Sequence, residues 1–552
     1  MLCVVAGGCR DNRTDYFVGG GYHAFGGLHG ISASFFNMTP TLCSPLSRTQ
    51  CGPLIFPRYP SWRRALVYLL FSAFTVCSGF GASRPNFIVI ITDDQGYADL
   101  GVHGIRDDVK TPNLDRLARE GVVFTDGYIT APQCSPSRAG LLTGRYQQRF
   151  GYDSITEGPL PLEEKTIADR LAAAGYATGM AGKWHLEPNI VTVAWALKKD
   201  PSLKTDNPER VTMPRELQLP YGPGERGFQD FYWGELDDYL RNYDLAGRPL
   251  APEGETHTTE DDRIEEQTAA ALAFLRRQDG DKPFFLYLAY YAPHVPLVAT
   301  DEYLARFPGD MPERRRTALA MIAAVDDGVG RILDLLEEKN MRDNTLVFFV
   351  SDNGAPLGAQ HGPPMKDLLP IDKIGPDWDG SRNDPLNGEK GMLAEGGIRV
   401  PFLAAWPGRI TPGTVWKKPV IALDIPATMI SAAGLPSDPA LDGVDLLPLL
   451  AAGEEKAPSR DLFWRFWNQA AVRSGDWKLL RAGGDRRMLF DLARDRGEQT
   501  NVISEHPDIA ADLEAKLTSW ADELSPPGLP DGPLRDQEVG WYGFYFGKVT
   551  PY

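Results

Sequence analysis

Short runs of consecutive apolar residues recur along the chain. Residues 87–91, 284–288 and 346–350 are apolar throughout, which is typical of parallel strands buried on both faces. Residues 166–174 and 313–338 instead repeat their apolar positions at helical spacing. Strands that alternate with helices predict an α/β fold, in which a layered sheet carries helices on both faces.

The pattern changes beyond about residue 450. Four short segments suggest an antiparallel sheet: residues 462–467, 471–472, 477–480 and 489–492. A helix over residues 507–524 would place Ile509, Leu513, Leu517, Trp520 and Leu524 on one face, for packing against that sheet. We expect a main domain over residues 84–450 and a C-terminal subdomain over 451–552, with the break in the charged stretch 448–459. The aromatic cluster 541–546 either packs on its own subdomain or forms a subunit contact.

The N-terminal region divides into two parts. Residues 1–61 show no periodic pattern, so we expect an unstructured or untranslated extension. Residues 62–83 combine two arginines, a short apolar run and small residues, which predicts a secretory signal and a secreted or periplasmic protein. A membrane anchor is the alternative, but the run is shorter than the roughly 18–20 residues needed to span a bilayer. A lipoprotein site at Cys77 is disfavoured by the bulky Val76.

Composition agrees with a large globular enzyme. The chain has 552 residues, of which 43% are hydrophobic and 24% charged, and this is enough for one large core and a smaller domain. Its net charge of −17 argues against a nucleic-acid partner. An anionic substrate therefore needs a local cationic pocket.

Oxygen ligands follow two of the predicted strands. Asp93 and Asp94 come after the first strand, and Asp352 and Asn353 come after the strand at 346–350. Active sites of open α/β sheets lie at the carboxyl ends of the strands. One such pair is usually a turn or a helix cap, but two pairs supply four hard oxygen donors suited to Ca²⁺ or Mg²⁺.

Cys134 is the only cysteine after residue 77, so the mature chain has no internal disulfide partner for it. Most free cysteines are small buried hydrophobes. Here, however, residues 134–145 read Cys-Ser-Pro-Ser-Arg-Ala-Gly-Leu-Leu-Thr-Gly-Arg, which resembles the sulfatase signature. In that family the cysteine is oxidised to formylglycine.

Further segments extend the resemblance over residues 85–502. They are residues 111–115, 175–186, 293–294, 387–390 and 395–401, in the order that the family shows. The resemblance implies an alkaline phosphatase-like α/β/α sandwich followed by a smaller C-terminal α+β domain.

The resemblance also implies residue roles. A divalent cation, Ca²⁺ rather than Mg²⁺, would be bound by Asp93, Asp94, Asp352, Asn353 and the formylglycine made from Cys134. Arg138 and Lys183 would stabilise the formylglycine hydrate, and Lys183 and Lys390 would face the sulfate. His294 would assist the leaving alcohol, and His185 would take a proton from the second hydroxyl.

Two departures from the family pattern concern loops. Glu187 stands where the family usually has Gly, and a long segment separates it from Gly227. A Ser that some relatives carry has no counterpart among residues 233–239. The stretch 358–384 is also long, and we expect specificity to reside in both loops.

The sequence therefore predicts a sulfuric ester hydrolase of arylsulfatase or N-acetylgalactosamine-6-sulfatase type. Its expected partners are a sulfated small molecule or glycan and a formylglycine-generating maturation enzyme, without a stable membrane span. Two alternatives stay open: a phosphate or phosphonate monoester hydrolase on the same scaffold, and a sulfated-glycan binding protein in which Cys134 stays a thiol.

Overall fold

The computed structural model describes residues 84–203, 213–358 and 378–547. The predicted extension and signal, residues 1–83, lie outside this part of the chain, as does most of the loop at 358–384. Among the described residues, no helix is both long and apolar enough to cross a membrane.

The predicted buried strands form the centre of one sheet. Strand β1 (Asn86–Asp93) lies between β8 (Phe284–Pro293) and β9 (Thr345–Ser351) and pairs parallel with both. All three strands are buried along their whole length, which explains their unbroken apolar sequences. The predicted parallel core is confirmed.

The sheet has ten strands in the order β11-β2-β10-β9-β1-β8-β4-β5-β6-β7. Strand β4 (Ala177–Gly182) continues the parallel pairing beside β8, and β5 (Asp230–Gly234) follows β4. The outer strands are short; they are β2 (Val122–Phe124), β6 (Asp238–Arg241), β7 (Glu255–Thr258), β10 (Phe402–Ala405) and β11 (Thr414–Trp416). Strands β3 (Gly127–Tyr128) and β12 (Val420–Ile421) form a separate pair.

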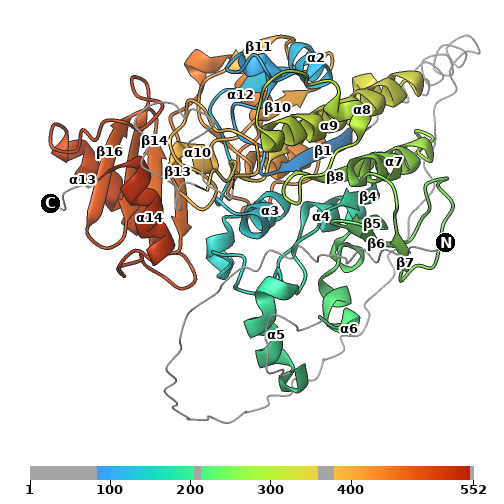
Figure 1. Ribbon diagram of the computed structural model, residues 1–552, viewed down its shortest axis with the longest axis horizontal. Coiled ribbons are helices and arrows are strands. Elements are labelled where there is room, and N and C mark those ends of the chain that lie inside the picture. The colour runs from blue at the N-terminus through green and yellow to red at the C-terminus, as the bar shows by residue number, and fades with distance from the viewer. Residues whose placement is uncertain (1–83, 204–212, 359–377, 548–552) are drawn as a thin grey trace, which may run out of the picture. The chain divides into compact units, whose positions relative to one another are not determined.

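Helices cover both faces of the sheet, as predicted (Figure 1). One face carries α2 (Pro112–Glu120), α7 (Arg263–Arg276) and α9 (Glu313–Glu338), and the other carries α3 (Cys134–Thr143), α4 (Ile167–Ala173) and α11 (Asp424–Ala432). Alternate residues of β1 enter different cores: Val89 belongs to the cluster with α3, and Ile90 to the cluster with α9. This alternation follows from the two-residue period of a strand.

The C-terminal part is an antiparallel sheet of four strands, as the sequence predicted. The strands are β13 (Asp461–Phe466), β14 (Gln469–Ser474), β15 (Trp477–Ala482) and β16 (Arg486–Asp491). Helix α13 (Pro507–Ala521) packs on it through Leu513, Leu517 and Trp520. The helix ends earlier than predicted, so Leu524 lies beyond it but is still buried.

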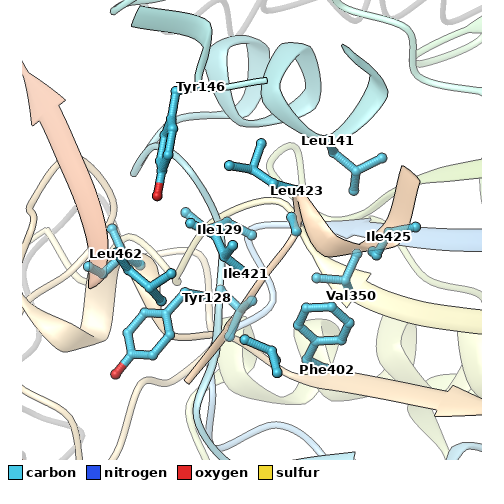
Figure 2. Packing of buried hydrophobic residues seen from close by; sticks show 14 of the residues in the cluster. Tyr128, Ile129, Leu141, Tyr146, Val350, Phe402, Ile421, Leu423, Ile425 and Leu462 are labelled. Carbon is cyan, nitrogen blue, oxygen red and sulfur yellow. The ribbon is translucent and has the colours of Figure 1, made fainter. Parts of the chain in front are cut away.

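The core on the α3 face continues into this second sheet. Figure 2 shows Leu462 of β13 beside Tyr128 and Ile129, and the same cluster includes Leu141 of α3. The predicted boundary at residue 450 stays a prediction, because one continuous core spans the segments on both sides of it.

The aromatic end of the chain lies in α14 (Asp536–Tyr545). Trp541 stacks on Trp467 and contacts the loop at Gly391. The remaining helices are short; they are α5 (Val193–Lys199), α6 (Arg215–Gln218), α8 (Asp301–Leu304), α10 (Glu395–Ile398) and α12 (Leu446–Ala452).

Candidate active site

Buried acids and an amide meet at the carboxyl ends of β1 and β9. Asp93 ends β1, and Asp94 follows it in the left-handed conformation at φ 65°. Asp352 and Asn353 follow β9 and are fully buried. The two strands are parallel neighbours, so their ends coincide: the Asp94 backbone N–H donates to Asp352 Oδ1 at 3.2 Å, and Asn353 Nδ2 donates to Asp94 Oδ1 at 2.5 Å.

Cys134 is the first residue of α3 and lies against these acids. Its Sγ is 3.3 Å from Asp93 Oδ1, and the residue is only 2% exposed. Burial, with the nearby Asp352 and Asp93 carboxylates, holds the pKa of the Cys134 thiol well above its ordinary value. Helix N-termini offer unpaired N–H groups that favour negative charge, so the position suits a developing anion although the thiol itself stays protonated.

Arg138 lies one helical turn after Cys134, on the same face of α3. Its Nε and Nη2 donate to Asp352 Oδ2 at 2.9 and 2.7 Å, and its Nη1 donates to the Lys183 carbonyl at 3.0 Å. The guanidinium is fully buried. Arg138 therefore joins α3, the end of β9 and the end of β4.

Lys183 and His185 follow β4. Lys183 Nζ is 2.6 Å from Asp93 Oδ2 and 4.9 Å from the centre of the Tyr291 ring. Burial disfavours the charge, but Asp93 and the other acidic groups nearby together outweigh it and raise the pKa of Lys183. His185 adopts φ 59°, and its buried Nδ1 has no hydrogen-bond partner among the described residues. Burial and Lys183 hold the pKa of His185 well below its ordinary value, so the ring is neutral.

His294 and Lys390 reach Asp94 from two other segments. His294 follows β8; its Nε2 is 3.6 Å from Asp94 Oδ2, and its Nδ1 is 2.6 Å from the Val295 carbonyl. Burial lowers the pKa of His294 to about 4. Lys390 Nζ is 2.7 Å from Asp94 Oδ1. Asp93 and Asp94 therefore each bind a lysine.

The structure brings together all ten residues singled out by sequence. Nine are linked by the contacts above, and His185 is coupled electrostatically to Lys183, Asp93 and His294. Ligand atoms of Asp93, Asp94, Cys134 and His294 lie within 4.8 Å of one another, as a metal site requires. The predicted ligand set had Asp352 and Asn353 rather than His294.

The donor set fits a hard divalent cation. Asn353 Oδ1 is buried without a hydrogen-bond partner among the described residues, which is the state of an oxygen whose partner is an ion. Burial and Asp93 raise the pKa of Asp352 to about 7, because three carboxylates crowd together here. A bound cation would offset that repulsion.

Two acidic residues near the site were not assigned a role by the sequence. Glu187, already noted as a departure from the family pattern, is 6% exposed. Glu235 lies in the turn between β5 and β6 and interacts electrostatically with Lys183 and Asp93. Glu235 comes near Lys183 because β5 pairs with β4, and no local sequence pattern predicts this.

Comparisons with known proteins agree with this geometry. The sulfatase family model matches residues 85–435, and the model for the C-terminal region of N-sulphoglucosamine sulphohydrolase matches residues 388–523. N-acetylgalactosamine-6-sulfatase of Homo sapiens is 30% identical over 82% of this chain and 92% of its own length. Arylsulfatase A of Homo sapiens is 31% identical over 78% of this chain and 85% of its own.

Among solved structures, Ps i-CgsB in complex with k-i-k-neocarrahexaose superposes with a TM-score of 0.64 and 29% identity, over 83% of this chain and 97% of that one. The residues matched by the sulfatase family model, 85–435, include the ten-stranded sheet, the buried acids and the Cys134 helix. The chain therefore belongs to the sulfatase family and is a sulfuric ester hydrolase.

Proposed function

We propose that the protein hydrolyses a sulfate monoester on a sulfated sugar or an aryl sulfate, with formylglycine made from Cys134 as nucleophile and Ca²⁺ as the bound cation. The observation that carries this proposal is the position of Cys134 at the start of α3, with its Sγ 3.3 Å from Asp93 Oδ1 and the nine other predicted site residues around it. The names of the relatives support a sulfated sugar as substrate.

The environment of Cys134 supports conversion of the residue. A nucleophilic cysteine needs a lowered pKa, whereas burial and two carboxylates raise the pKa of this thiol. The same carboxylates are suited to a cation that stabilises a hydroxyl. Formylglycine, when hydrated, supplies two hydroxyls on one carbon, one to attack sulfur and one to release the sulfate again.

Cation binding is assigned to Asp93, Asp94, Asp352 and Asn353, together with the side chain at position 134. The bound ion would supply Lewis acidity toward the sulfate and would lower the pKa of the attacking hydroxyl. Arg138 fixes the Asp352 carboxylate through two donated hydrogen bonds. Arg138 therefore orients a cation ligand and adds positive charge beside position 134.

Lys183 and Lys390 would hold the sulfate. Their ammonium groups bind Asp93 and Asp94 from different segments, so both cations lie at the rim of the acid cluster. A sulfate group is anionic throughout the reaction, and fixed cations stabilise it without reorganisation.

The two histidines are proposed for proton transfer. The Nδ1 of His294 lies against the Val295 carbonyl and its Nε2 faces Asp94, so Nε2, once it has taken up a proton, would assist the leaving alcohol. His185 is neutral and its Nδ1 has no partner among the described residues, so it is suited to accept a proton from the second hydroxyl.

The location of the protein belongs to the proposal as well. We assign residues 62–83 to a secretory signal, with the mature enzyme beginning near residue 84, a catalytic domain to residue 450 and a C-terminal subdomain after it. A formylglycine-generating enzyme must act on Cys134 before α3 is buried, because the residue is inaccessible in the folded chain.

Paired substrates test the proposed reaction. The wild-type protein, produced with a maturation enzyme, is expected to hydrolyse 4-nitrophenyl sulfate well above 4-nitrophenyl phosphate, and Cys134→Ala is expected to abolish both activities. Preference for the phosphate ester would favour a phosphate or phosphonate hydrolase. Tight binding of sulfated glycans without turnover would favour a binding protein.

A further inference from the structure

Glu187 differs from Asp93, Asp94 and Asp352 because no lysine or arginine in the described part of the chain forms an ion pair with it. The residue is 6% exposed, and its Oε2 makes no hydrogen bond with any described residue. Leaving a buried carboxylate oxygen without a partner costs about 1–3 kcal/mol or more. Such an atom in a folded protein calls for a ligand or a water.

The backbone around Glu187 is firmly held. The Leu160 N–H donates to the Leu186 carbonyl at 2.9 Å, and Asn189 Nδ2 donates to the Glu187 carbonyl at 3.3 Å. Asn189 also caps the short helix that begins the inserted segment, through its side chain to the Val191 N–H. These hydrogen bonds fix the backbone that carries the Glu187 carboxylate.

Glu235 approaches the same place from the neighbouring strand. Strands β4 and β5 pair parallel, with Gly182 opposite Trp233. Glu187 therefore follows the end of β4 and Glu235 follows the end of β5, at the sheet edge that carries Lys183. Glu187 is buried, whereas Glu235 is partly exposed.

The two carboxyl groups interact electrostatically with each other and with Lys183 of the site. Burial and Glu235 raise the pKa of Glu187 to about 8, and Glu187 and Glu235 both interact with Lys183. A pair that retains a proton near neutral pH both donates and accepts hydrogen bonds. It also retains negative charge, which repels a second anion.

Resting on the proposed function, we propose that Glu187 and Glu235 line the subsite for the ring that bears the sulfate ester, where they hydrogen-bond uncharged hydroxyls and disfavour a second anionic group. Lys183 and Lys390 then select the one sulfate to be cleaved. The acidic pair selects against a neighbouring sulfate or carboxylate on the same ring.

Three aryl sulfates probe the subsite: phenyl sulfate, 2-hydroxyphenyl sulfate and 1,2-phenylene disulfate. They present hydrogen, a hydroxyl or a second sulfate beside the same scissile bond. Sulfate release is measured for the wild type and for Glu187→Gln, Glu187→Ala and Glu235→Gln. Glu163→Gln, at an exposed acid, is the matched control.

Glu187→Ala is expected to lower kcat/KM for 2-hydroxyphenyl sulfate about tenfold relative to phenyl sulfate, mainly through KM, since one hydrogen bond is worth about this factor. Glu235→Gln, which removes negative charge that the pair retains, is expected to raise the relative kcat/KM for the disulfate about tenfold, whereas Glu187→Gln, which resembles the protonated carboxyl, is expected to change this ratio less. Glu163→Gln leaves all ratios unchanged.

A change by the same factor on all three substrates would overturn the inference and assign Glu187 a structural role. The Tm of Glu187→Gln, the isosteric variant, is compared with that of the wild type to show whether a loss of activity comes from unfolding. Absence of turnover of every ester by the matured wild type would instead contradict the proposed function itself.

Discussion

At the residue scale, the site balances three buried carboxylates against three cations, of which Arg138 and Lys183 are buried and Lys390 is partly exposed. Lys183 binds Asp93 and Arg138 binds Asp352. Burial raises the pKa of Asp93, but Lys183, His294 and Arg138 together hold it well below its usual value. The cations thus keep Asp93 ionised, and the acids position the cations for an anionic substrate.

Replacement of Lys183 by Ala is expected to reduce kcat for 4-nitrophenyl sulfate by about 10²–10³, because one preorganised charge on the reacting group is worth this much. Steady-state kinetics on the matured enzyme checks it, with the exposed Lys165→Ala as control. An equal reduction of kcat in both variants, or an increase in KM with kcat unchanged, would contradict the role assigned to Lys183.

The assignment of Asn353 as a cation ligand makes a second prediction. Dialysis against a chelator should lower the Tm of the wild type, and added Ca²⁺ should restore it, because an ion that binds only the folded state stabilises it. Asn353→Ala is expected to need at least tenfold more Ca²⁺ for the same restoration. Identical Ca²⁺ titrations of Tm in variant and wild type would exclude Asn353 from the site.

At the scale of elements, the end of β4 determines where Lys183 and His185 lie. Gly182 has φ 98°, and a Cβ there would come within 2.0 Å of the Ala289 carbonyl oxygen on β8. A side chain at this position would push β4 away from β8. Only glycine combines this backbone conformation with such a close approach.

Gly182→Ala is therefore expected to destabilise the protein by more than the ~1 kcal/mol of backbone strain alone and to lower kcat. Gly175→Ala is the matched control, because Gly175 has φ 89° but nothing within 4 Å of its Cβ position. Denaturant unfolding and aryl sulfate kinetics measure both effects. Equal destabilisation by the two substitutions would show that contact with Ala289 is unimportant.

At the scale of the whole molecule, a buried ionic cluster joins the C-terminal sheet to α10 and to strand β3. Lys478 of β15 binds Glu395 at 2.9 Å and Glu498 at 2.8 Å. Glu395 also pairs with Arg399 and accepts a hydrogen bond from Tyr128. The motif at residues 395–401, which in the sequence is only a family marker, therefore ties strand β3 to the C-terminal sheet.

The cluster predicts a pH dependence of stability. Burial and Glu395 raise the pKa of Glu498 to about 7 despite Lys478, whereas an unfolded glutamate titrates near 4.5. Between these values the folded state binds more protons than the unfolded state, so the Glu498 contribution to stability falls as pH rises from about 4.5 to 7. Glu498→Gln removes this titration.

Relative to wild type, Glu498→Gln should gain about 1–3 kcal/mol of stability between pH 4.5 and 7. Urea unfolding at several pH values measures the difference, and the exposed Glu505→Gln is the control. A difference between wild type and Glu498→Gln that does not change with pH would be inconsistent with a raised pKa at Glu498.

Features that depend on neighbouring residues in the chain could be predicted from the sequence, whereas contacts between distant segments could not. Strands β1, β8 and β9 were predicted because strands buried on both faces are apolar throughout, and the residues at their ends were predicted with them. Strand β7 was not predicted, because it is short, polar and mostly exposed. The approach of Glu235 to Lys183 depends on the register of β4 and β5, and the Lys478 cluster depends on packing between sheets.

The most direct test is the mass of the tryptic peptide covering residues 120–138 from the secreted protein, produced alongside a maturation enzyme that converts a known sulfatase. The account predicts a loss of about 18 Da at Cys134, or the corresponding hydrate, since an aldehyde replaces the thiol at the nucleophile. An unmodified Cys134 thiol in protein that still hydrolyses sulfate esters would contradict it.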